Sequence, residues 1–144
     1  MKSWTNRIFD TFTADGKPNG RIIRVWERGE ATLRYGPGQV YVATLLPGAT
    51  KGPHLHMRRD SLFACVRGTV RITTRQSKPG QGIYEYTTVT SGVGVGEDVI
   101  SVYVPAGTPC VLYNPALFDA LVVNVSSEPY DAADEHEVLD WRPE

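Results

Sequence analysis

Two of the three histidines in the chain, His54 and His56, are separated by one residue in the stretch KGPHLHM, residues 51–57. Side chains two residues apart on an extended strand point to the same face, so both imidazoles would then enter one space. Imidazole is the commonest metal ligand in proteins, and it titrates near neutral pH. The pair could therefore bind a metal ion, transfer protons in catalysis, or lie solvated in a surface turn after Gly52 and Pro53.

Strand signals dominate the elements that must position this pair. Nine short runs are rich in Val, Ile, Tyr and Thr, and turn sequences such as PGQ, KPGQG and PAGTP separate them. The acidic tail DAADEHEVLDWRPE could hold one short turn of helix. We expect an all-β sandwich or small barrel, for which a jelly roll is one solution. The predicted strands are 21–26, 31–35, 40–46, 61–66, 70–74, 84–89, 99–104, 110–114 and 120–125.

Length and composition limit the class of protein. The chain has 144 residues, the size of one domain, which we place over residues 1–144. Its 15 basic and 16 acidic residues give a net charge of −1, which argues against nucleic acid or an anionic membrane as a partner. No apolar run approaches the ~20 residues that span a bilayer, and the first ten residues lack the apolar core of a signal peptide. We expect a soluble cytoplasmic protein whose two cysteines form no disulfide framework.

The residues around the histidine pair have the spacing of two motifs. The matching positions are Gly48, His54, His56, Ser61 and Gly68, followed by Pro105, Gly107, Cys110 and Asn114. This spacing resembles the two motifs of the cupin superfamily, whose members are small jelly-roll barrels. Metal-binding cupins supply two histidines and a glutamate from the first motif and a third histidine from the second. Here Ser61 takes the glutamate position and Cys110 the third histidine position, so the resemblance implies no metal; if one binds, its ligands would be His54, His56 and Cys110.

Longer stretches resemble the nucleotide-sugar branch of this superfamily. KGPHLHM is similar to the RGxHxH signature of that branch, with Lys51 in place of the arginine. SLFACVRGTVRI, VYVPAGTPCVLYN and ALVVNVSSEPYDAADEHEVLDW resemble the strand and turn that follow it, the second motif and the C-terminal signature. Together the pieces cover about residues 20–142. Two groups share this scaffold, the dTDP-4-dehydrorhamnose 3,5-epimerases and the dTDP-4-keto-6-deoxyglucose 3,4-ketoisomerases.

Three positions favour the ketoisomerases over the epimerases. The ketoisomerases have both histidines of the pair, whereas the epimerases usually lack the second. The epimerases use a tyrosine acid where this chain has Asn124, and a second-motif histidine where it has Cys110. Asparagine cannot replace tyrosine as a proton donor. The resemblance therefore implies a metal-independent isomerase or epimerase without a cofactor, which acts on a dTDP-linked 4-keto-6-deoxy sugar through proton transfer by His54 and His56.

Several other residues could bind the nucleotide sugar. Lys51 would meet either the enolate or the diphosphate, as a point charge. Arg24 and Arg71 are preferred to the other arginines because each interrupts an apolar strand, and most of the others, Arg59 among them, are interpreted as solvated surface charges. The tyrosines could donate protons or hydrogen bonds, or simply pack. The full set of candidate substrate-binding residues is Lys51, Tyr41, Arg24, Arg71, Cys110, Tyr113 and Tyr130.

The resemblance also implies a homodimer. In these cupins an N-terminal strand pair, such as 21–26 with 31–35 here, often crosses to the second subunit. Asn114 is expected to fix a turn, and His136, in the acidic tail, to be solvent-exposed. Two other functions stay open: a non-catalytic cupin that binds a sugar or another small ligand, and a metal-dependent cupin.

Overall fold

The computed structural model describes residues 1–27, 36–93 and 98–143. The regular elements in these ranges are ten strands and one short 3₁₀ helix. They are β1 (Lys2–Phe12), β2 (Pro18–Ile23), β3 (Gln39–Leu45), β4 (Thr50–His54), β5 (Ser61–Arg67), β6 (Thr69–Lys78), β7 (Ile83–Gly92), β8 (Asp98–Val104), β9 (Cys110–Tyr113), β10 (Ala120–Ser126) and η1 (Ala132–Asp134). No helix within this part of the chain has the length and hydropathy needed to cross a membrane.

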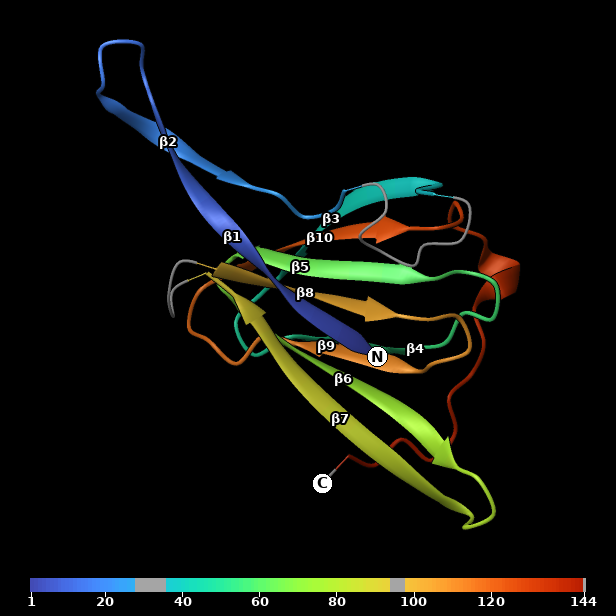
Figure 1. Cartoon of the computed structure of the whole chain (residues 1–144). Helices are drawn as coiled ribbons and strands as arrows, with labels where there is room; N and C mark the ends of the chain where they lie inside the picture. The colour runs from blue at the N-terminus through green and yellow to red at the C-terminus, as the bar shows by residue number, and fades with distance from the viewer. Residues whose placement is uncertain (28–35, 94–97, 144) are drawn as a thin grey trace.

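The strands form two sheets, one on each side of the core. The six-stranded sheet has the order β2-β1-β8-β5-β10-β3, and the four-stranded sheet has the order β4-β9-β6-β7. Neighbouring strands in the described ranges pair antiparallel. Figure 1 shows the β1–β2 hairpin extending away from the body of the molecule on one side and the β6–β7 hairpin on the other. The all-β, double-sheet prediction is confirmed.

Period-2 alternation places apolar side chains between the sheets, most clearly on β3. On β3, Tyr41, Ala43 and Leu45 are partly or fully buried, whereas Val40 and Val42 are exposed. The largest buried cluster draws on both sheets and contains Leu45, Phe63, Cys65, Val70, Ile72, Val102, Val104, Cys110, Leu112, Ala120 and Val122. Both cysteines are buried and free, which agrees with the predicted lack of a disulfide framework.

Seven of the nine predicted strands are confirmed, from the run at 40–46 onward. The run 21–26 is right only in part, because β2 ends at Ile23 and the chain leaves the strand there. Val25 and Trp26 instead pack against a second apolar cluster that contains Leu62 and Tyr103. The run 31–35 lies outside the described residues.

Two strands, β1 and β4, were not predicted, whereas the short helical turn in the tail is confirmed as η1. The sequence of β4, TKGPH, contains glycine and proline and was interpreted as a turn. Proline is tolerated on an edge strand, and β4 lies at the edge of the four-stranded sheet, where β9 is its one partner among the described strands. This edge strand carries the histidine pair toward the space between the sheets.

Candidate active site

A cavity of about 390 Å³ lies between the sheets, within the size range of small-molecule sites. Six of the predicted site residues line it: Tyr41, Lys51, His54, His56, Cys110 and Tyr130. Ser61, at the glutamate position of the cupin motif, also lines it, so the motif positions converge on one space. The remaining lining residues are Gln39, Ala43, Arg59, Phe63, Val104, Pro105, Thr108, Leu112, Val122, Asn124 and Glu135.

The end of β4 brings the histidine pair into the cavity. The pairing of β4 with β9 shifts register between Lys51 and His54, where the chain passes through Gly52 with φ of 107°. A Cβ at Gly52 would lie 2.8 Å from the carbonyl oxygen of Cys110, so only glycine allows this close approach. The rings of His54 and His56 are stacked, with centroids 6.3 Å apart and planes at 20°. The expectation that both imidazoles enter one space is confirmed.

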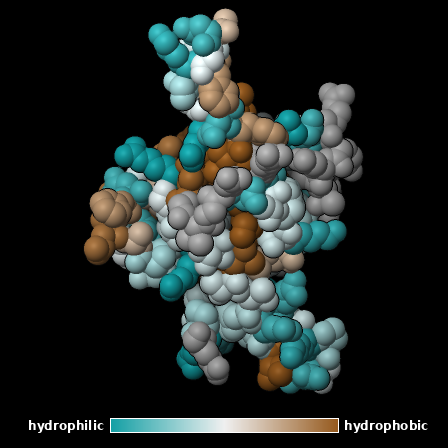
Figure 2. All heavy atoms as spheres, turned by 60° about the vertical axis from the view of Figure 1, so that its left-hand side comes forward, coloured by the Kyte–Doolittle hydropathy of each residue, from teal (hydrophilic) through white to brown (hydrophobic). Residues whose placement is uncertain are grey.

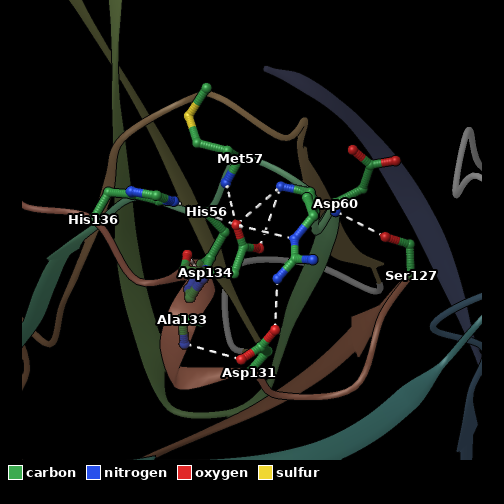
Figure 3. A network of polar contacts seen from close by, with 9 residues as sticks. His56, Met57, Asp60, Ser127, Asp131, Ala133, Asp134 and His136 are labelled. Carbon is green, nitrogen blue, oxygen red and sulfur yellow. Dashed lines mark hydrogen bonds and ion pairs between the residues drawn. The ribbon is translucent and has the colours of Figure 1, made fainter.

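The tail that contains η1 holds the loop after the pair through Asp134 (Figure 3). The buried Asp134 carboxylate accepts hydrogen bonds from the backbone N–H of Met57 at 3.0 Å and of Arg58 at 3.2 Å. Burial alone would raise the pKa of Asp134, but these N–H groups and the nearby His56 and Arg58 hold it below its ordinary value. His136 is exposed, as expected, and its Nε2 lies 3.5 Å from the same carboxylate.

The hydrogen bonds of His56 define its tautomer. Its Nδ1 lies 3.0 Å from the carbonyl oxygen of Asp134, which can only accept, so Nδ1 carries the proton. Its Nε2 is then an acceptor, and it lies 3.2 Å from a guanidinium nitrogen of Arg59, which can only donate. Burial and the positive charge of Arg59 lower the pKa of His56, against the opposing effect of Asp134. His56 is therefore a neutral ring with both nitrogens engaged.

His54 differs from its neighbour because its ring nitrogens are free. Among the described residues, no hydrogen bond involves its side chain, and its only ring contact is with His56. His54 is exposed to solvent as a residue, but partial burial of its ring at the cavity lowers its pKa. The charges of Arg59 and Lys51 lower this pKa further, whereas Glu135 raises it. The imidazole is thus neutral at neutral pH, with a lone pair available in the cavity. This combination suits a general base.

Tyr41 and Asn124 are cross-strand neighbours on β3 and β10, and both line the cavity. Burial raises the pKa of Tyr41, against a smaller lowering by Arg59, so its hydroxyl keeps its proton at neutral pH. Asn124 is fully buried; its Oδ1 accepts a hydrogen bond from the Ser126 hydroxyl, and its Nδ2 has no partner. A protonated tyrosine hydroxyl is therefore present in the cavity on the strand next to Asn124.

The sequence suggests three conditional metal ligands, His54, His56 and Cys110. Within the described ranges, no group of three or more His, Cys, Asp or Glu side chains is arranged to hold a metal ion. Cys110 is 6% exposed, and burial raises the pKa of its thiol to about 12, so the thiol is protonated at neutral pH in this structure. The Nε2 of His56 faces Arg59. Among the described residues, His54, His56 and Cys110 are not arranged as a three-ligand set.

Three predicted substrate-binding residues lie outside the cavity. Arg24 follows the end of β2 and pairs on the surface with Glu27 at 3.3 Å. Arg71 and Tyr113 are opposite each other on β6 and β9, and both are exposed. An interrupted apolar strand was taken as a sign of function, but for Arg71 strand alternation alone explains it. Val70 and Ile72 point into the core, and Arg71 between them points to solvent.

Two charged lining residues were missed by sequence reasoning. Arg59, interpreted as a surface charge, is only 8% exposed and contacts His56. Glu135 lies in the C-terminal segment that carried the family resemblance, which was the available signal for it. Asn114, by contrast, is outside the cavity and fixes a turn as predicted, since its side chain bonds the backbone of Leu45, Ala116 and Phe118.

Comparison with known proteins finds likeness in structure rather than in sequence. No family model matches the chain, and no curated protein matches it. A dTDP-sugar isomerase from Desulfovibrio desulfuricans G20 aligns with a TM-score of 0.72, over 94% of this chain and 83% of the isomerase, at 16% identity. A sugar 3,4-ketoisomerase from Thermoanaerobacterium thermosaccharolyticum, solved with TDP, aligns with a TM-score of 0.66, over 96% of this chain and 89% of the ketoisomerase, at 16% identity. A 3'-monoepimerase from Streptomyces bikiniensis, solved with dTDP-quinovose, aligns with a TM-score of 0.66, over 94% of this chain and 69% of the epimerase, at 22% identity.

These likenesses extend over nearly the whole chain and confirm the predicted fold. The chain has the cupin jelly-roll barrel found in nucleotide-sugar isomerases and epimerases. At these identities the likeness establishes architecture, and the reaction must be argued from the side chains in the cavity.

Proposed function

We propose that the chain is a nucleotide-sugar isomerase that moves the ketone of a dTDP-linked 4-keto-6-deoxy sugar from C4 to C3. The observation that carries the proposal is His54, a neutral imidazole with free nitrogens that lines a cavity of substrate size. Solved structures with this fold include a sugar 3,4-ketoisomerase that binds TDP, which supports the choice of substrate class.

The proposed reaction needs one base and one acid. His54 removes the proton from C3, which the neighbouring carbonyl acidifies. The electron pair of the C3–H bond becomes the C3=C4 double bond, and the π electron pair of the C4 carbonyl moves onto the C4 oxygen. Protonation at C4 and at the C4 oxygen, together with loss of the proton on the C3 oxygen, then places the ketone at C3 and a hydroxyl at C4. Atoms and electrons balance without an oxidant or a reductant.

Tyr41 is the acid that we assign to C4. Its hydroxyl is protonated at neutral pH, and it lines the same cavity as His54. His56 is not the acid in this assignment, because its one proton is bound to the carbonyl of Asp134. We place Lys51, which is exposed at the cavity, against the diphosphate, and Tyr130, 56% exposed, against the base or sugar.

The competing function is a non-catalytic cupin that binds a sugar nucleotide. Asn124 favours it, because an amide occupies the place where the epimerases have their acid. Both functions predict that dTDP raises the melting temperature, since a ligand that binds the native state stabilises it. Only the isomerase exchanges the sugar's protons with solvent.

The test is incubation with dTDP-4-keto-6-deoxyglucose in heavy water, followed by NMR. We expect deuterium at C4 of the product, at C3 of recovered substrate, and a ketone at C3. The His54→Asn variant should lose on the order of 10²–10⁴ in rate, with an unchanged circular dichroism spectrum and dTDP affinity. Stabilisation by dTDP without deuterium would establish the binding protein, and deuterium at C5 would indicate a 3,5-epimerase. Full activity of His54→Asn would exclude this residue as the base.

A further inference from the structure

Arg59 is a positive charge enclosed by the cavity residues. It is 8% exposed and lines the cavity. Its charge acts on the pKa of four other lining groups besides His56, namely Tyr41, His54, Cys110 and Tyr130. It therefore lies among the groups that the proposed reaction uses, whereas Lys51 is exposed.

This guanidinium lacks the partners that usually balance a buried charge. Among the described residues, no acidic side chain lies within ion-pair distance of Arg59. One terminal nitrogen donates to the neutral His56, the Tyr41 hydroxyl is a second neutral hydrogen-bond partner, and the buried Nε–H has no acceptor. A buried cation without an anion is destabilising unless other groups compensate it. A negative charge that forms on a ligand in this cavity would supply the missing partner.

We propose that Arg59 stabilises the enolate oxygen at C4 of the substrate, a deduction that rests on the isomerase function proposed above. The substrate's ketone is neutral on arrival, and its oxygen becomes anionic only when His54 has taken the C3 proton. A fixed cation that acts on the developing charge lowers the barrier without tightening substrate binding. Lys51 is then left for the diphosphate, which is anionic throughout.

The same contacts assign separate roles to the two histidines. The carbonyl of Asp134 fixes the ring of His56, and the Nε2 of that ring accepts from Arg59. His56 is thus a positioning residue, which directs the guanidinium toward the cavity. His54 alone has a free lone pair and acts as the base. In this assignment the two histidines do not share proton transfer: His54 is the base, and His56 positions the guanidinium of Arg59.

Arg59→Met tests this assignment, with Arg59→Lys and Lys51→Met as comparisons. We expect Arg59→Met to lower kcat by about 10²–10³, as does loss of one oxyanion donor, while KM and the calorimetric Kd for dTDP change less than about threefold. Arg59→Lys should recover part of kcat, because it keeps the charge but not the planar fork. Lys51→Met should show the opposite pattern, with raised KM and dTDP Kd.

Thermal unfolding separates this role from a merely structural one. Removing an uncompensated buried charge should leave the melting temperature of Arg59→Met unchanged or raise it. A lower melting temperature together with an unchanged kcat would show that Arg59 only supports the fold. Parallel losses in dTDP affinity and kcat/KM, with kcat retained, would make it a diphosphate ligand. A wild-type protein that exchanges no substrate proton would overturn the isomerase function, and this assignment with it.

Discussion

At the scale of single residues, the proton affinity of His54 is set by opposed neighbours. Burial, Arg59 and Lys51 lower its pKa, and the carboxylate of Glu135 raises it. Glu135 also lines the cavity, so its charge acts on the base across the space where substrate would bind. The carboxylate therefore limits how far the two cations, Arg59 and Lys51, lower the pKa of the base. A general base is most effective when its pKa is near the working pH.

Glu135→Gln should move the acid limb of the pH profile. Activity should rise with pH as His54 loses its proton, and kcat/KM reports this ionisation in the free enzyme. Removing the carboxylate destabilises the imidazolium, so His54 deprotonates at lower pH and the inflection shifts downward. Glu135→Asp, which keeps the charge, should shift it less, and Lys51→Met should shift it upward. An upward shift with Glu135→Gln would mean that another group controls this limb.

The residues that sequence reasoning could place are those with a motif. His54, His56, Ser61 and Cys110 follow cupin spacing, and all four line the cavity. Arg59 could not be placed, because it is preceded by Arg58 in a loop that has no periodicity. Arg58 is exposed and pairs with Asp131, whereas its neighbour is buried beside His56. Only the contacts of the folded loop distinguish the two arginines.

At the scale of elements, the site depends on how the edge strand β4 meets β9. Thr50 and Lys51 pair with Tyr113 and Leu112, the register then shifts, and His54 pairs with Cys110. The shift is possible because Gly52 adopts φ of 107°. Short strands of Val, Ile and Tyr were predicted from their composition, but β4 was not, since its glycine and proline have the composition of a turn. Pairing with β9 makes it a strand, and such pairing is not encoded locally.

Gly52→Ala should therefore damage both stability and catalysis. A Cβ there would lie 2.8 Å from the Cys110 carbonyl oxygen and would require a strained φ. The backbone strain alone costs about 1–2 kcal/mol, and displacement of β4 would add to it and move His54. Gly48→Ala is a matched control, since Gly48 also has positive φ but open space around it. Urea unfolding should show a larger loss in the free energy of unfolding for Gly52→Ala than for Gly48→Ala, and kcat should fall only in Gly52→Ala. Equal losses in the free energy of unfolding would show that the close approach at Gly52 is unimportant.

At the scale of the whole molecule, the projecting β1–β2 hairpin presents apolar side chains to solvent. Phe12 is 58% exposed and Ile22 is 57% exposed. Figure 2 shows apolar surface where this arm joins the body. At the opposite edge of the same sheet, β3 exposes Val40 and Val42. Exposed apolar surface and open strand edges are features that association removes. The homodimer predicted from the sequence remains a prediction, and the hairpin is the surface that we assign to it.

The hairpin assignment predicts a dimer of about 32 kDa, twice the chain mass of 15.9 kDa, by light scattering. Replacing Phe12 and Ile22 together with glutamate should give a monomer, because two charges would have to be buried against the partner. Ile83→Glu, on the other projecting hairpin and 51% exposed, should leave the dimer intact. A wild-type mass of one chain would exclude the dimer. A dimer that survives the double substitution but is lost in Ile83→Glu would place the interface on the β6–β7 hairpin instead.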